Sequence, residues 1–400
     1  PFYSAAVLIG ISRMIEVSLH IPFNITLVFV TLILAVYVIT GGLKAVMYTD
    51  ALQGMIMAVM MIVLLLHTYS LLGGVIPGHQ ALTDMAHLMP EKLQNGGMQG
   101  WTQGAEFGTP IWLTIYTTIV YGVGIGVLAQ PQLAIRFMTV SSDRELNRAI
   151  LYGGLFILLM TGVAYIVGAL SNAVFYQLFE KISIQMAGGN MDKIIPLYIE
   201  KVMPSWFSAL FLLAMFAAAM STLSSQYHTG GTSLGRDLCE QSARFSREGS
   251  IITTRIGVCV AILLTLIWAW SLPTSIIARA TAFFFGLCAA AFLPVYFLGL
   301  YWRGVTKAGA IVSLSGGFLV SMFWLLFVHK KEAQALGVCK AIFGKATLTA
   351  NAAKGSWIWL MQWVDPNVVA LPISFVLAVL ISLVTRQYDA KNLDYCWRNF

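Results

Sequence analysis

A run of hydroxyl side chains interrupts an apolar stretch at a place where it could hold a small cation. Residues 217–229 read AAAMSTLSSQYHT. Ser221, Thr222 and Ser225 share one helical face because they are spaced three and four residues apart. Hydroxyl oxygens and the carbonyls of small residues suit a hard cation such as sodium. The alternative is that these hydroxyls bond across a packed helix interface, where each bond is worth about 0.6 kcal/mol in a membrane.

A second stretch is a poor continuous helix and could expose backbone groups to a solute. Residues 121–132 read YGVGIGVLAQPQ, with three alternate glycines followed by Gln130 and Pro131. In a helix interior glycine costs about 1 kcal/mol and proline about 3 kcal/mol relative to alanine. A broken helix in an apolar region indicates a transporter binding site. A packing kink, with glycines at a close helix crossing, remains the alternative.

A third stretch, residues 41–53, reads GGLKAVMYTDALQ. The two glycines predict a tight turn, and Thr49 or Asp50 is a suitable N-cap for the helix that follows. Under a functional interpretation, Asp50 stands at the inner mouth of a cation path. A short hairpin with a capped helix explains the same residues.

The elements that carry these stretches must be membrane helices. Hydrophobic residues form 58% of the 400-residue chain and charged residues only 10%, against about 25% charged residues in soluble domains. A span needs about 20 mostly apolar residues. Ten segments qualify and predict an all-α polytopic membrane protein: 3–19, 22–40, 51–74, 111–135, 149–176, 205–229, 251–270, 274–300, 309–328 and 367–385.

The charge balance predicts orientation rather than a charged partner. The net charge of +7 is typical of cationic cytoplasmic loops facing anionic lipid, here in a multi-pass protein of the plasma (inner) cell membrane. No basic stripe with interleaved aromatic residues is present, so we expect no nucleic acid partner. The motifs HExxH, GxSxG and Walker A are absent, and no carboxylates are paired within a span. We therefore expect no enzymatic activity, no catalytic residues and no cofactor.

Together the three stretches resemble the sodium:solute symporter family, in particular its proline and pantothenate branch. The resemblance implies a leucine-transporter-like bundle of two inverted five-helix repeats. Residues 1–74 would be the remainder of the first repeat, 111–300 the second repeat, and 301–400 the peripheral helices and C-terminal tail, all within one transporter domain. The chain starts at Pro1 without a Met, and the resemblance implies that it is N-terminally incomplete, beginning inside the third core helix.

The resemblance also implies the ion sites. Ala218, Ser221 and Thr222 match the family's sodium site, Ser225 is a weaker addition, and sodium is the only metal expected. Asp50 matches an aspartate linked to sodium movement on the cytoplasmic side.

The residues that would bind the solute depart from two known patterns of the family. Sugar-transporting members carry Asn and Tyr where this chain has Val123 and Gly126, and proline-transporting members carry aromatic residues where it has Val123 and Val127. We therefore expect another small organic solute, such as a carboxylate, with Gln130 as a polar contact beside Pro131.

The function implied is sodium-coupled secondary symport of a small organic solute by alternating access, with the lipid bilayer as surroundings. The alternative is a solute-sensing membrane module of a signalling protein that does not transport to a useful extent. A channel is disfavoured because no ring of charged residues and no repeated pore loop is visible in the sequence.

Overall fold

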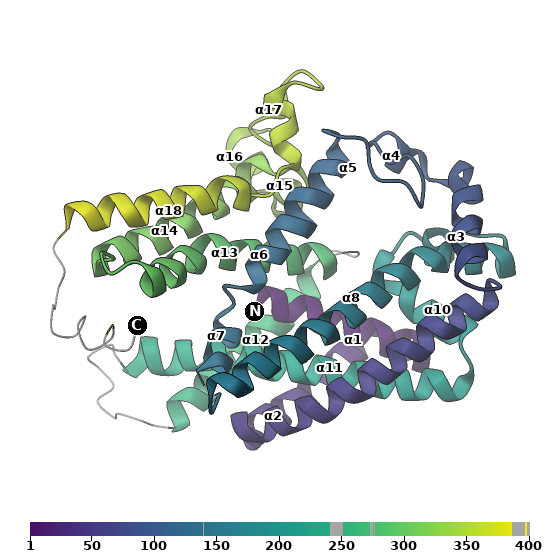
Figure 1. Cartoon of the computed structure of the whole chain (residues 1–400), viewed down its shortest axis with the longest axis horizontal. Coiled ribbons are helices and arrows are strands. Elements are labelled where there is room, and N and C mark those ends of the chain that lie inside the picture. The colour runs from purple at the N-terminus through teal and green to yellow at the C-terminus, as the bar shows by residue number, and fades with distance from the viewer. Residues whose placement is uncertain (139, 241–250, 273–274, 276, 386–396, 398–400) are drawn as a thin grey trace. The chain divides into compact units, whose positions relative to one another are not determined.

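The computed structural model describes residues 1–138, 140–240, 251–272, 275, 277–385 and 397, apart from the side chains of residues 41–49, 135 and 240. The described chain is overwhelmingly helical (Figure 1). Within the described residues, ten helical stretches are long and apolar enough to cross a membrane, which confirms the predicted all-α class and the ten spans. They are Phe2–Leu19, Phe23–Thr40, Asp50–Leu71, Pro110–Ala134, Asp143–Phe179, Ser205–Cys239, Ile251–Ser271, Ile277–Tyr301, Lys307–Val328 and Asn367–Val384.

Two compact units make up the chain, and the first comprises residues 1–89, 100–102 and 135–280. Its complete helices are α1 (Phe2–Leu19), α2 (Phe23–Leu71), α3 (Val75–Asp84), η1 (Met85–Leu88), α8 (Asp143–Phe179), α9 (Ser183–Met186), η3 (Met191–Lys193), α10 (Ile194–Val202), α11 (Ser205–Thr232), η4 (Ser233–Glu240) and α12 (Ile251–Ser271). Helices α1, α2, α11 and α12 all contact one another, and α8 packs on α2.

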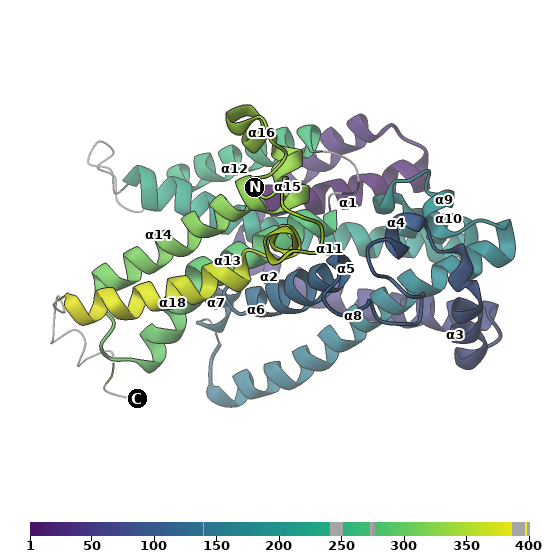
Figure 2. The ribbon, with the colours of Figure 1, turned by 90° about the horizontal axis from the view of Figure 1, so that it is seen from above.

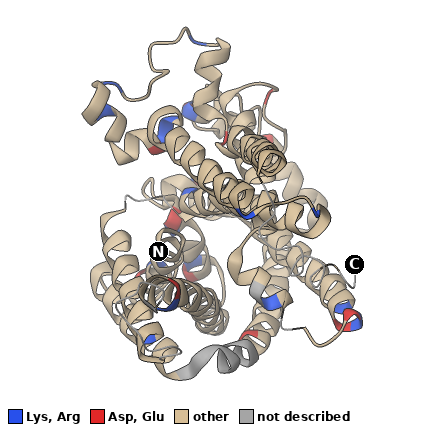
Figure 3. Ribbon diagram, turned by 90° about the vertical axis from the view of Figure 1, so that its left-hand side faces the viewer, with Lys and Arg blue, Asp and Glu red and all other residues tan. Residues whose placement is uncertain are grey.

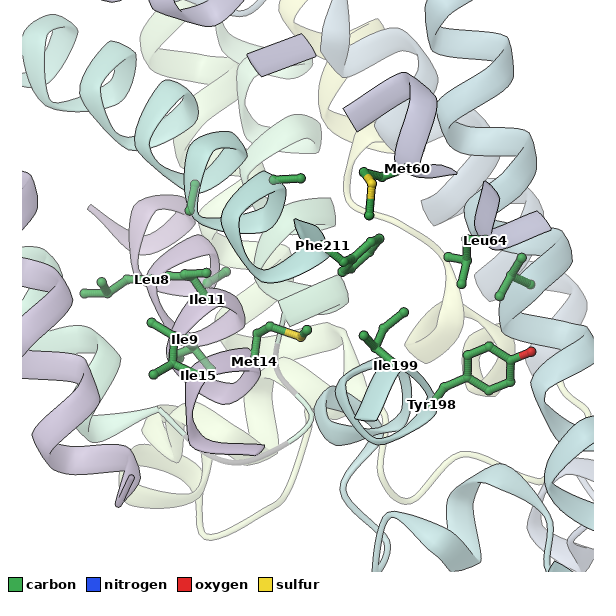
Figure 4. Close-up of a cluster of buried hydrophobic side chains, with 14 of the residues drawn as sticks. Leu8, Ile9, Ile11, Met14, Ile15, Met60, Leu64, Tyr198, Ile199 and Phe211 are labelled. Atoms are coloured by element: carbon green, nitrogen blue, oxygen red, sulfur yellow. The ribbon is translucent and has the colours of Figure 1, made fainter. Parts of the chain in front are cut away.

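Buried apolar side chains from most of these helices form the core of this unit. Figure 4 shows Met14 of α1, Met60 of α2 and Phe211 of α11 within one such cluster, together with Tyr198 of α10. The Tyr198 hydroxyl is bonded to the Thr68 hydroxyl at 2.8 Å, so the polar end of this buried ring has a partner. Close packing of this kind, rather than a hydrophobic effect, holds helices together in lipid.

Helices α11 and α12 cross at glycines. A Cβ added to Gly257 would stand 2.2 Å from the carbonyl oxygen of Gly231, and one added to Gly235 would stand 2.2 Å from the oxygen of Thr253. Side chains larger than hydrogen therefore do not fit this crossing, which brings the C-terminal end of α11 and the start of η4 directly against α12.

The second unit comprises residues 90–99, 103–134 and 281–400. Its helices are α4 (Glu91–Gln94), α5 (Pro110–Leu113), η2 (Thr114–Val123), α6 (Gly124–Val127), α14 (Lys307–Phe323), η5 (Trp324–Val328), α15 (Lys330–Leu336), α16 (Val338–Phe343), α17 (Trp357–Leu360), η6 (Met361–Trp363) and α18 (Asn367–Val384). Two further helices have residues assigned to both units, α7 (Pro131–Phe137) and α13 (Ile277–Tyr301).

Helices α14 and α18 run side by side through this unit (Figures 1 and 2). The hydroxyl of Ser313 donates to the carbonyl of Ser374 at 2.9 Å, and the hydroxyl of Ser374 donates back to the carbonyl of Ser313 at 2.8 Å. At one end of the pair the backbone N–H of Thr306 donates to the Ser382 hydroxyl at 3.1 Å. The pair is thus joined by polar contacts at two levels as well as by packing.

One local prediction is wrong. No tight turn forms at Gly41-Gly42, and neither Thr49 nor Asp50 caps a helix, because α2 runs without a break through all 49 residues from Phe23 to Leu71. At about 1.5 Å per residue it is longer than two crossings of a hydrocarbon core of about 30 Å. It therefore holds two windows of span length, 23–40 and 50–71.

Charged residues are sparse along the long helices (Figure 3). The spacing of three residues between Arg13 and Glu16 predicts that they neutralise each other on one helix. A bond of 2.7 Å within α1 confirms this, and Lys193 adds a second contact to the same carboxylate at 3.1 Å. The pairing removes the need to place a lone charge in an apolar span.

Candidate functional site

The hydroxyl run lies on α11, which is unbroken from Ser205 to Thr232, so its members sit one helical turn apart as predicted. Ala218, Ser221 and Thr222 are half-buried, whereas Ser225 is 8% exposed. Some hydroxyls of this helix bond back to its own carbonyls: Ser224 donates to Ser221 at 3.0 Å, and Thr229 donates to Ser225 at 2.9 Å. The backbone of the run is therefore partly used by its own side chains.

An arginine joins two residues that the sequence analysis selected separately. One nitrogen of the Arg136 guanidinium, Nη2, donates to Oδ2 of Asp50 at 2.9 Å and to the hydroxyl of Ser225 at 2.7 Å. The three side chains come from α2, α7 and α11. The Asp50 side chain is 13% exposed and that of Arg136 is 38% exposed, so the ion pair is partly shielded from solvent and its hydrogen bonds are charge-assisted.

The second oxygen of the Asp50 carboxylate is left without a donor. Asp50 Oδ1 is buried and has no hydrogen-bond partner among the described residues, and neither does the amide oxygen of Gln53 in the same helix. Buried acceptors without donors favour a nearby positive charge. The arrangement around Asp50 therefore suits the transient approach of a small cation. Arg136 was not among the predicted site residues, although it lies shortly after the Gln130-Pro131 step.

The predicted helix break is confirmed, and its position is sharper than expected. Helix α5 continues as the π-helical segment η2 and then as α6, which ends at Val127. Residues 128–130 are outside any helix, and α7 begins at Pro131. Gln130 is 5% exposed and its amide nitrogen has no hydrogen-bond partner among the described residues. Such π-helical segments are frequent at functional sites.

The glycines of this helix also serve close packing, which is the alternative that the sequence left open. A Cβ on Gly126 would stand 2.3 Å from the carbonyl oxygen of Phe285, whereas one on Gly124 would meet nothing within 4 Å. Val123 and Val127 are half-buried on the same helix. A broken helix and a glycine crossing are therefore both present.

A buried carboxyl group beside this helix was not among the site residues predicted from the sequence. Asp365 is 4% exposed and lies just before α18. Its Oδ1 accepts from the backbone N–H of Asn367 at 2.9 Å, and its own N–H donates to the hydroxyl of Thr117 at 3.0 Å. Burial raises the pKa of Asp365 to about 6, although the bond from Asn367 and the nearby His329 act in the opposite direction. No sequence motif surrounds it, because its neighbours are distant along the chain.

The predicted residues fall into two groups. Asp50 and the four residues of α11 belong to the first unit, whereas Val123, Gly126, Val127 and Gln130 belong to the second. Within the first unit the structure joins Asp50 to Ser225 through Arg136.

Comparison with known proteins supports the resemblance to the sodium:solute symporter family. The model of the sodium:solute symporter family matches residues 2–317. Sodium/pantothenate symporters from Haemophilus influenzae and Escherichia coli are 28% and 27% identical over 310 and 331 residues, covering 76% and 80% of this chain. A sodium/proline symporter from Staphylococcus aureus is 25% identical over 324 residues, covering 79% of it. The chain spans 59%, 62% and 58% of the length of these three relatives.

Among solved structures, a Na⁺-coupled sialic acid symporter in a substrate-bound outward-open state resembles the chain in fold. The TM-score is 0.62 at 17% sequence identity, and the match covers 96% of this chain and 75% of the other. This supports the predicted leucine-transporter-like helical bundle.

Proposed function

Since this chain belongs to the sodium:solute symporter family, we propose that the protein is a sodium-coupled secondary symporter of the plasma membrane that imports a small organic solute by alternating access. The observation that carries the proposal is the family match over residues 2–317, because that stretch includes the hydroxyl run, the broken helix and Asp50. The proposal concerns the whole protein, whereas the chain spans about three fifths of the length of its curated relatives.

The proposed sodium site is on α11. Ala218 would contribute its backbone carbonyl, Ser221 and Thr222 would contribute hydroxyl oxygens, and Ser225 would lie at the inner edge of the set. The half-buried position of the first three residues supports this assignment, because a coupling ion must enter and leave. Ser225 has a different role in the proposal, since its hydroxyl already accepts from Arg136.

Asp50 and Arg136 would control the inner end of the ion path. A sodium ion that approaches Asp50 competes with the guanidinium for the same carboxylate, because both are cations and the carboxylate is partly shielded from water. When the ion leaves, Arg136 restores the pair. The guanidinium thus would prevent Asp50 from retaining sodium, which would favour release into the cytoplasm.

The proposed solute is a small organic carboxylate that binds at the helix break. Val123, Gly126, Val127, Gln130 and Pro131 would line this site, with the unpartnered Gln130 amide nitrogen as a donor. Pantothenate and proline, the solutes named for the curated relatives, both carry a carboxylate.

The proposed division of the chain is a first repeat over residues 1–74, a second repeat over 111–300 and peripheral helices over 301–400.

Uptake into proteoliposomes tests the function. Labelled proline, pantothenate and other carboxylates are offered to the intact protein with sodium outside, or with sodium replaced by choline. We expect sodium-dependent accumulation of at least one carboxylate. Binding of a solute without accumulation would favour the alternative, a solute-sensing module.

The sodium site has its own test. Ser221→Ala and Thr222→Ala should raise the sodium concentration for half-maximal uptake at least tenfold. Thr232→Ala is the matched control, because its hydroxyl bonds back to His228 of the same helix at 2.8 Å. If Ser221→Ala and Thr222→Ala showed the same sodium dependence as the Thr232→Ala control, the sodium site would lie elsewhere.

A further inference from the structure

Asp365 is enclosed by backbone on two sides. A Cβ added to Gly122 of η2 or to Gly286 of α13 would stand 3.2 Å from its carboxyl oxygens. Two glycines from different helices therefore leave room for the carboxyl group and for little else. The third side is formed by the start of α18, whose Asn367 N–H donates to the carboxyl group.

Polar atoms around this carboxyl group lack partners. The side chain of Asn367 is fully buried, and neither its amide oxygen nor its amide nitrogen has a hydrogen-bond partner among the described residues. His329, which is 7% exposed, uses Nδ1 to contact the Glu332 carboxylate, while its buried Nε2 has no partner in the described part of the chain. Such atoms are costly in a buried place unless a proton or a water molecule supplies what is missing.

The charges that face Asp365 do not neutralise it. His329 and Glu332 lie within electrostatic range on the side of α15, and their effects on the carboxyl group have opposite signs. Tyr121 faces it from η2, and the neighbouring residues Gly286 of α13 and Asn367 of α18 carry no charge. Within the described part of the chain, no lysine or arginine is among the groups that act on it. A buried carboxylate without a cationic partner favours its protonated form.

We propose that Asp365 is a proton-binding site and that its protonation determines how η2, the N-terminal part of the broken helix, packs against α13 and α18. The link to the broken helix is direct, because Asp365 also binds Thr117 of η2 through its backbone N–H. A proton fits the enclosed space better than a metal ion, which needs several oxygen ligands around it. Loss of the proton places a negative charge against two glycine backbones, and the helices must then shift or admit water. The proposal goes beyond the symport function, since it involves neither the solute nor the coupling sodium.

Infrared difference spectroscopy on the intact protein in lipid tests the site without any transport measurement. We expect a protonated-carboxyl band that titrates with a midpoint near pH 6, and that is lost in Asp365→Asn. The asparagine keeps an oxygen acceptor for the Asn367 N–H, so the variant should fold. Asp84→Asn, which removes an exposed carboxyl group, should leave the band unchanged.

A second variant, His329→Gln, and a titration at several sodium concentrations complete the test. His329→Gln should move the midpoint to higher pH, because His329 lowers the pKa of Asp365. A band that persists in Asp365→Asn, or a carboxylate that stays ionised from pH 4 to 8, would overturn the proposal. A midpoint that depends on sodium concentration at fixed pH would also overturn it, since the site would then hold a metal ion. These readouts remain valid even if sodium-dependent uptake is never found.

Discussion

The Arg136 side chain connects two residues that have separate proposed roles. Its Nη2 atom contacts both Asp50 and Ser225, so a substitution at any of the three positions changes the environment of the other two. Energies of residues that share one donor are not additive. The role of Asp50 is therefore best measured together with that of Arg136.

The Asp50–Arg136 pair should show strong coupling. Arg136→Gln leaves the carboxylate, whose side chain is 13% exposed, without a charged donor and should lower stability by about 1–3 kcal/mol. Asp50→Asn added to Arg136→Gln should cost little more, since the unpaired charge is then gone. Thermal unfolding of the two single variants and the double variant in detergent measures this. Costs of the two single variants that simply add would show that the pair contributes nothing.

Asp365 predicts a stability profile with a definite sign. Its pKa is raised from an ordinary value near 3.9 to about 6 by burial. The folded state therefore binds the proton more tightly than the unfolded state, and the stabilisation is full below about pH 4 and lost as pH rises through about 6. The loss amounts to about 3 kcal/mol.

Asp365→Asn should remove this dependence, so that its melting temperature relative to the wild type rises between pH 4 and 6 and then levels off. Melting curves of both proteins across that range provide the measurement. A constant difference at every pH would contradict the assignment.

Contacts between side chains that are close in the sequence could be predicted, whereas contacts between distant residues could not. The pairing of Arg13 with Glu16 is predictable because one helical turn separates them. Asp365 could not be found, since its surroundings at Thr117 and Gly286 are 248 and 79 residues away along the chain, and nothing in its own segment predicts burial.

Among the elements, the broken helix depends on where its glycines face a neighbour. Gly126 touches the backbone of Phe285, whereas Gly124 faces open space. Alternate glycines in one short run therefore have different roles, which the sequence pattern alone does not separate.

A matched pair of substitutions follows from this difference. Gly126→Ala should destabilise the protein by about 1–3 kcal/mol, because the added methyl group overlaps the Phe285 carbonyl. Gly124→Ala should be neutral or stabilising by up to about 1 kcal/mol, since alanine is the better helix former. Melting temperatures of the two variants provide the comparison. Equal effects would show that the crossing at Phe285 is looser than described.

Spans were easier to predict than turns for a physical reason. Twenty apolar residues have no alternative to a helix in lipid, because every backbone group must be paired. A pair of glycines disfavours a helix only weakly, because each costs about 1 kcal/mol in a helix interior. The neighbouring helical turns can offset this cost. Helix α2 therefore passes through Gly41-Gly42, where the sequence predicted a turn.

For the whole molecule, the predicted orientation can be tested by labelling. In cells, and on a background without the native cysteines, Lys354→Cys should react with a membrane-impermeant maleimide. Its long loop, residues 330–366, is expected to face outward, because the short cation-rich loops, such as residues 302–308, are expected to be cytoplasmic. Arg303→Cys should react only after permeabilisation. Both positions are exposed. The reverse pattern would invert the orientation and place Asp365 near the cytoplasm.

The serine contacts between α14 and α18 have a consequence for membrane insertion. In lipid, the hydroxyls of Ser313 and Ser374 would have no outside partner if the two helices entered the bilayer far apart, whereas together they bond to each other's carbonyls. Release from the insertion machinery as one hairpin therefore avoids exposing them. The segment between these spans carries Asp365 and must then cross the membrane as a loop, so Asp365 reaches its place beside Gly122 and Gly286 only after both helices are inserted.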